Sequence, residues 1–137
     1  MNNHYKIIVP FYNVEKWIKI CIRSIKKQSN KNFQCVLIDD ASTDNTVSVI
    51  KAEIKNDKRF FLLENKNNLG ALENIYNAIQ FSKPSDEDII VNLDGDDWFA
   101  NPNVIDTLNQ YYTGDCLITY GSHAIYPGGG RGKFCQS

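Results

Sequence analysis

Three carboxylates crowd into four positions directly after an apolar run of this sequence. The run Ile89–Leu93 is followed by Asp94, Asp96 and Asp97. A strand that ends in such a cluster brings negative groups to one point, and their mutual repulsion is costly unless a cation or hydrogen-bond donors compensate for it. The pattern therefore predicts a site for Mn²⁺ or Mg²⁺. The alternative is a solvated acidic turn, because Asp and Gly are common turn residues.

The composition sets the size and class of the molecule. A chain of 137 residues that is 42% hydrophobic fits one domain with one core, so we expect residues 1–137 to form a single domain. Within it, residues 124–137 contain the run Gly128–Gly132 and are expected to form a flexible end. The four cysteines form no CxxC pair, which favours reduced, mostly buried thiols over a zinc site or a disulfide framework.

Charge argues against nucleic-acid binding, and hydropathy argues against a transmembrane helix. The chain carries 15 basic and 16 acidic residues, a net charge of −1, and so has no general electrostatic affinity for nucleic acid. No apolar stretch approaches the roughly 18 residues that a transmembrane helix needs. We therefore expect a cytoplasmic protein without a transmembrane segment, free in solution or peripheral to a membrane.

Strand-like and helix-like segments alternate along the chain. Short apolar runs predict strands, and apolar residues three or four apart predict helices with one buried face. The expected strands are 7–9, 33–38, 59–64, 88–93 and 116–120, and the expected helices begin near residues 14, 46, 72 and 102. This alternation predicts an α/β fold, Rossmann-like, with a mostly parallel sheet and helices on both faces.

A second acidic pair follows another strand. Asp39 and Asp40 come directly after the predicted strand 33–38. Ligands of open parallel sheets bind beyond the carboxyl ends of the strands, so we expect this pair and the acidic cluster to share one crevice. There an Asp can accept a hydrogen bond from a nucleobase imide or a ribose hydroxyl, while the cluster holds a cation against a diphosphate.

Five ordered blocks of the sequence resemble family 2 glycosyltransferases, which have the GT-A fold. The resemblance runs from about Ile7 to Trp98, and no single block is decisive, whereas the five in order are a strong joint signal. The blocks are Ile8–Asn13, Ser24 with Gln28, Asp39–Thr46, Asn68–Gly70 and Leu93–Trp98.

The resemblance implies an enzyme that transfers a sugar from a nucleotide-diphosphate-sugar, commonly a UDP-sugar, to an acceptor hydroxyl with inversion. The acceptor would be a saccharide, a lipid-linked molecule or a protein. Pro10 and Tyr12 would line the nucleotide pocket, and Asp40, together with Asp39, would bind the base or ribose.

The same resemblance assigns the acidic cluster to the donor and its metal. Asp94 and Asp96 would form the DxD pair beside the ribose, sugar and diphosphate, and Asp96 and Asp97 would be the metal ligands. A cation there would stabilise the charge that develops on the leaving group.

Two departures from the family pattern limit this assignment. An Arg that many relatives carry is absent at Asn74–Tyr76, which affects the donor's phosphates. Relatives also continue past this length, and their general base lies in that later half, so no catalytic base is assigned here.

We therefore expect a truncated chain, completed by an oligomer or a further domain. It is either an active glycosyltransferase or a catalytically incomplete fragment that binds a nucleotide-sugar. A phosphoryl-transfer domain with an aspartyl nucleophile is a third hypothesis, but its motif does not match residues 94–97.

Overall fold

The computed structural model describes residues 3–126, and within them helices and strands alternate as the sequence predicts. The α/β class is confirmed. Residues 127–137, which include Cys135 and most of the expected flexible end, lie outside the described residues, and so do the predictions made for them. The elements are β1 (Tyr5–Phe11), α1 (Ile18–Lys26), β2 (Phe33–Asp39), α2 (Thr46–Ile54), β3 (Phe60–Glu64), α3 (Ala71–Ser82), β4 (Ile89–Asn92) and α4 (Val104–Tyr111).

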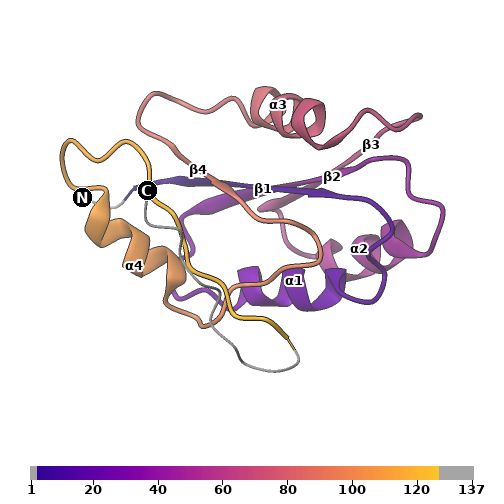
Figure 1. The fold of residues 1–137 in the computed structure, drawn as a ribbon, viewed down its shortest axis with the longest axis horizontal. Coiled ribbons are helices and arrows are strands. Elements are labelled where there is room, and N and C mark those ends of the chain that lie inside the picture. The colour runs from indigo at the N-terminus through magenta and orange to yellow at the C-terminus, as the bar shows by residue number, and fades with distance from the viewer. Residues whose placement is uncertain (1–2, 127–137) are drawn as a thin grey trace.

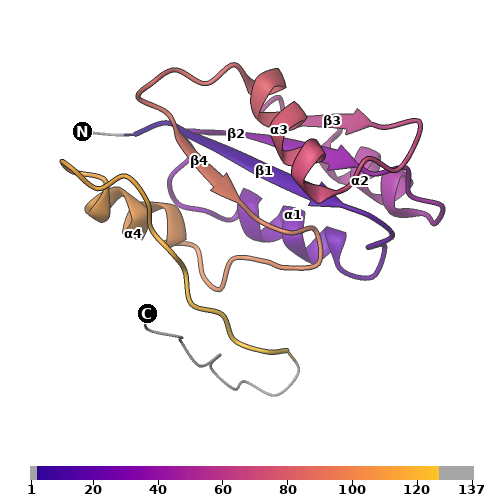
Figure 2. The same ribbon diagram turned by 45° about the horizontal axis from the view of Figure 1, so that its top comes forward.

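The sheet is parallel throughout, and its strand order is β3-β2-β1-β4. Helices cover both faces, as expected: α3 lies on one face, and α1, α2 and α4 lie on the other (Figure 1). After β3 the chain crosses back over the sheet through α3 and places β4 on the far side of β1 (Figure 2). The direction of winding therefore reverses between β1 and β4, which is where open α/β sheets form their binding crevices.

Each face of the sheet has its own apolar layer, because successive side chains of a strand point to opposite faces. All seven residues of β1 are buried, as expected for a central parallel strand. The larger layer joins the odd-numbered residues of β1 to α1, α2 and α4, and the smaller layer packs Ile8, Val36 and Ile38 against Ala78 of α3. Cys21 and Cys35 are buried free thiols and Cys116 is a partly buried one, which agrees with the expectation of reduced thiols for these three.

The start of α1 differs from the sequence prediction. The apolar series begins at Val14, but the helix begins at Ile18, because residues 14–17 form a turn in which the N–H groups of Trp17 and Ile18 both donate to the Val14 carbonyl at 2.9 Å. Asn13, just before this turn, has a φ of 51°. Its side-chain oxygen accepts the Thr43 N–H at 2.8 Å, so the turn is shaped by a contact with the loop after β2 that periodicity does not report.

The strand expected at residues 116–120 does not form. Leu117, Ile118 and Tyr120 are 87%, 71% and 90% exposed, and within residues 3–126 the sheet ends at β4. An apolar segment becomes a strand only where another strand offers backbone hydrogen bonds, and none of the described strands lies beside this one.

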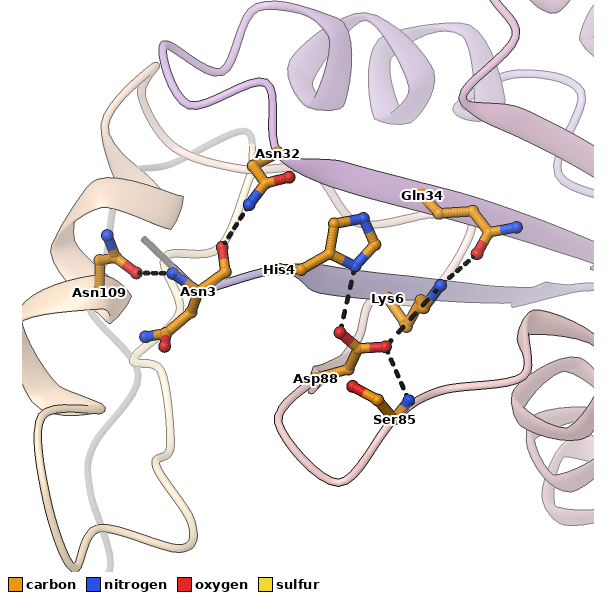
Figure 3. A network of polar contacts seen from close by, with 8 residues as sticks. All are labelled: Asn3, His4, Lys6, Asn32, Gln34, Ser85, Asp88 and Asn109. Atoms are coloured by element: carbon orange, nitrogen blue, oxygen red, sulfur yellow. Dashed lines mark hydrogen bonds and ion pairs between the residues drawn. The ribbon is translucent and has the colours of Figure 1, made fainter. Parts of the chain in front are cut away.

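A polar network joins the first residues of β1 to the segment before β4 (Figure 3). Asp88 accepts the Ser85 N–H at 2.9 Å and lies 3.3 Å from His4 Nδ1. Lys6 lies on β1 between Asp88, at 3.9 Å, and Gln34, whose Oε1 accepts its ammonium at 2.6 Å. These contacts fix the end of the sheet opposite the carboxyl ends. No helix in residues 3–126 has the length and apolar content to cross a membrane.

Candidate functional site

A cleft of about 270 Å³ opens beyond the carboxyl ends of β1 and β4, at the point where the winding of the sheet reverses. It brings together side chains that are more than 50 positions apart in the sequence. The prediction that the two acidic groups share one crevice is confirmed for Asp40, Asp94 and Asp96. The lining residues are Pro10, Phe11, Tyr12, Val14, Asp40, Ala71, Asp94, Gly95 and Asp96.

Pro10 and Tyr12 lie on one wall of the cleft, at the end of β1. The Pro10 carbonyl accepts the Gly95 N–H at 3.2 Å, which joins this wall to the acidic cluster. The Tyr12 side chain is 48% exposed, so its ring is available to a ligand in the cleft. An exposed aromatic face is a suitable surface for a nucleobase to stack on.

Gly95 is buried between two exposed aspartates because the backbone passes very close to β1. A Cβ atom added to Gly95 would lie 2.6 Å from Phe11 Cβ and 3.3 Å from Val14 Cγ2. This close approach turns the backbone so that Asp94 and Asp96 line the cleft on either side of the glycine. No role for Gly95 was predicted from the sequence. Its position between two acids was the only sign that it has one.

Asp39 and Asp40 diverge at the end of β2. Asp39 is buried, its Oδ1 accepts the Ser42 N–H at 3.0 Å, and it is not among the residues that line the cleft. Asp40 does line the cleft, and its carboxylate accepts the backbone N–H groups of Leu69 at 2.6 Å and Gly70 at 3.2 Å. Asp39 thus holds its own turn, whereas Asp40 faces the space where a ligand would bind.

The pKa of Asp40 reflects these contacts. Burial raises it, but the hydrogen bonds from Leu69, Asn74, Gly70 and Asn65 together outweigh burial and hold the pKa below its usual value. Asp40 is therefore ionised at neutral pH and acts only as a hydrogen-bond acceptor.

The three carboxylates of the acidic cluster lie close enough together to share one cation. Asp94, Asp96 and Asp97 are exposed, and each offers a carboxylate oxygen within 4.8 Å of the others. Burial raises the pKa of Asp97, and the neighbouring charges of Asp96 and Asp94 raise it further. Hard oxygen ligands in such a group suit Mg²⁺ or Mn²⁺, which would relieve the repulsion. Asp97 belongs to this cluster but does not line the cleft itself.

The segment after the cluster is anchored by Ser24 of α1 and by Gln28, which lies just after the end of α1. Ser24 Oγ accepts the Phe99 N–H at 3.0 Å. Gln28 is fully buried; its Nε2 donates to the Asn101 carbonyl at 2.7 Å, and its Oε1 accepts the Ile105 N–H at 3.1 Å. Ser24 and Gln28, one helical turn apart, were noted from the sequence without a physical role, and the structure supplies one.

Trp98 packs beside the cluster. Its ring stacks on that of Trp17, with centroids 6.1 Å apart and an interplanar angle of 22°, and Tyr126 contacts both rings edge-on.

The family model for glycosyl transferase family 2 matches residues 6–134, nearly the whole chain. The chain belongs to glycosyltransferase family 2. Glycosyltransferase GlyG of Streptococcus pneumoniae serotype 4 is 33% identical to it over 127 residues, which cover 92% of this chain and 41% of GlyG.

Solved structures share the GT-A fold with this family 2 chain. TarS 1–349 of S. aureus, in complex with UDP-GlcNAc, superposes with a TM-score of 0.69 at 24% identity, over 79% of this chain and 30% of that one. The mannosyltransferase PcManGT of Pyrobaculum calidifontis, in complex with GDP-Man and Mn²⁺, gives a TM-score of 0.67 at 22% identity, over 75% of this chain and 30% of that one. The chain thus spans less than half of each of these three proteins.

Proposed function

We propose that this chain binds a nucleotide-diphosphate-sugar, with UDP as the nucleotide, together with a divalent cation, and contributes the donor half of an inverting sugar transfer. The observation that carries the proposal is the single cleft lined both by the end of β1 with Asp40 and by Asp94 and Asp96. Family membership and the UDP-GlcNAc complex of TarS support the same donor class.

Each wall of the cleft has a role in this proposal. Pro10 and Tyr12 contact the nucleoside, and Asp40 accepts a hydrogen bond from its imide or ribose. Asp39 supports the turn beside Asp40. These groups orient the donor by shape and hydrogen bonding.

The acidic cluster binds the other end of the donor. Asp94 and Asp96 lie beside the ribose, sugar and diphosphate, and Asp96 and Asp97 hold Mn²⁺ or Mg²⁺. When bound, the cation would supply Lewis-acid stabilisation of the leaving diphosphate. The Mn²⁺ in the PcManGT complex supports a cation requirement in this fold.

A fragment that binds the donor without transferring the sugar is the second candidate. The chain spans 41% of GlyG, and the three carboxylates that line the cleft are all assigned to the donor or its cation. The acceptor's proton then needs a base outside the described residues. Release of UDP from UDP-GlcNAc, measured with and without saccharide acceptors, distinguishes the two candidates.

Thermal shift with UDP, GDP and inorganic phosphate, each with and without Mn²⁺, tests the binding proposal. A ligand at about 100 times its Kd stabilises the folded state by about 2.7 kcal/mol. We expect UDP with Mn²⁺ to raise the Tm more than UDP alone, and Asp97→Asn to remove the metal-dependent part. Asp86→Asn, at an exposed acid outside the cluster, is the matched control and leaves that part unchanged. Stabilisation by phosphate alone, equal to that by UDP, would contradict the proposal.

A further inference from the structure

Asn74 has a buried polar side chain, and the function proposed above gives it no role. It lies one turn into α3 and is 1% exposed. Its Oδ1 accepts a hydrogen bond from Asn65 Nδ2 at 2.6 Å, and the same Nδ2 donates to Asp40 Oδ1 at 3.3 Å. A polar group buried this deeply is stable only when it is paired, and its partner Asn65 lies at the carboxyl end of the sheet.

The Asp40 carboxylate accepts several of the hydrogen bonds at this end of the sheet. Its Oδ1 accepts from Leu69 N–H at 2.6 Å and from Asn65 Nδ2 at 3.3 Å, and its Oδ2 accepts from Gly70 N–H at 3.2 Å. These three protein donors orient one carboxylate that lines the cleft, and Asn74 holds one of the three, Asn65. The position of this carboxylate is therefore set by the loop between β3 and α3 and by the first turn of α3.

Position 74 needs a neutral hydrogen-bond acceptor. The Asn65 NH₂ group has two N–H donors, one for Asp40 and one for Asn74. The Asn74 carbonyl oxygen accepts the second of these and so holds the Asn65 amide in the orientation that serves Asp40. A carboxylate at position 74 would accept from Asn65 but would repel Asp40, and an apolar side chain would not accept at all.

We propose that Asn74 is a positioning residue for donor binding: through Asp40 and Asn65 it fixes the cleft wall against which the nucleoside part of the donor binds. The proposal rests on the proposed function. On this proposal the nucleoside wall and the acidic cluster contribute separately to the affinity for the donor. Asn74 supports the nucleoside wall, and none of its hydrogen bonds among the described residues goes to the acidic cluster.

Two ligands distinguish these parts in the full 137-residue chain. We measure the Kd of UDP and of inorganic pyrophosphate, both with Mn²⁺, for the wild type and for Asn74→Ala. Loss of the hydrogen bond that orients Asn65 towards Asp40 predicts a UDP Kd about tenfold higher, with the pyrophosphate Kd within about twofold of the wild type. Asn65→Ala, at a loop residue that contacts both Asp40 and Asn74, is expected to give the same selective loss and carries the test if Asn74→Ala fails to fold.

Ser82→Ala is the matched control. Ser82 is also a buried polar residue of α3, its hydroxyl donates to the Ile79 carbonyl at 2.8 Å, and it does not line the cleft. We expect this variant to lose stability while its UDP Kd stays at the wild-type value.

Three results would overturn the proposal. The first is a UDP Kd that rises as much in Ser82→Ala as in Asn74→Ala, and the second is an equal loss of pyrophosphate affinity in Asn74→Ala. The third is an unchanged UDP Kd in both asparagine variants. In all three cases wild-type UDP binding persists, so the proposed function stands; a wild type that binds no UDP overturns both.

Discussion

At the scale of single residues, Gly95 decides where the acidic side chains lie. Gly95→Ala forces a Cβ against Phe11 Cβ at 2.6 Å, a contact that a backbone-attached atom cannot avoid. Overpacking of this kind costs about 1–3 kcal/mol, so we expect a lower urea midpoint and weaker binding of Mn²⁺ to the displaced cluster.

The control for Gly95→Ala is Gly121→Ala, where an added Cβ meets no atom within 4 Å. That variant is expected to keep both the urea midpoint and the Mn²⁺ affinity of the wild type. Equal stability of the two variants would show that the approach to Phe11 does not constrain the loop.

The sequence predicted the charged residues of the site better than the residues that position them. Asp40, Asp94 and Asp96 follow strands, and strand ends can be located from apolar runs alone. Gly95 and Asn74 depend on how closely two segments approach in space. A local pattern carries no such distance, so their roles emerge only from the structure.

At the scale of secondary structure, α1 acts as the support for everything after the acidic cluster. Gln28 contributes most, because it pairs with the Asn101 carbonyl and the Ile105 N–H from a fully buried position. It thereby joins α1 to the first turn of α4, although 73 and 77 positions separate the paired residues.

Gln28→Leu tests this support. The leucine leaves the buried Ile105 N–H without its partner, at about 1–3 kcal/mol, whereas the Asn101 carbonyl belongs to an exposed residue and can bond to water. We expect a fall of about 1–3 kcal/mol in the free energy of unfolding and faster hydrogen exchange at Ile105.

Gln110→Leu, at an exposed position of α4, is the control and should change neither quantity. Unchanged exchange at Ile105 in Gln28→Leu would show that α4 is held by its apolar contacts alone.

The elements themselves were largely predictable, and the exceptions have tertiary causes. Short apolar runs located four strands, and the 3.6-residue period of apolar residues located four helices, because burial of a helix on one face imposes that period. The segment 116–120 has a strand-like composition but no neighbouring described strand. The turn before α1 exists because Asn13 contacts the loop after β2.

At the scale of the whole molecule, the order of strands explains why distant acids meet. β1, β2 and β3 follow one another in one direction, and β4 then takes the free side of β1. This reversal opens a crevice between the ends of β1 and β4, and the sequence could predict only that some such crevice exists. Its exact position depends on the strand order, which apolar patterns do not specify.

The charges of the folded chain predict that it loses stability in acid. The pKa values of Asp40, Asp44, Glu53, Asp57 and Asp88 all lie below their usual values. For Asp88, burial raises the pKa, but the Ser85 N–H and the charges of His4 and Lys6 outweigh burial, so the net pKa is lowered. A carboxyl group with a lowered folded-state pKa stabilises the fold above its unfolded pKa, and that stability is lost as the pH falls through the folded pKa.

Asp97 acts in the opposite sense, since its raised pKa favours the folded state as the pH falls, but it is one group against five. The free energy of unfolding without metal should therefore decrease from about pH 5 downward, as measured by urea denaturation at a series of pH values. Asp88→Asn should flatten this decrease, because it removes one of the five groups, whereas exposed Asp86→Asn should not. A urea midpoint that holds constant or rises between about pH 5 and pH 3 would mean that the hydrogen bonds to these carboxylates add no net stability.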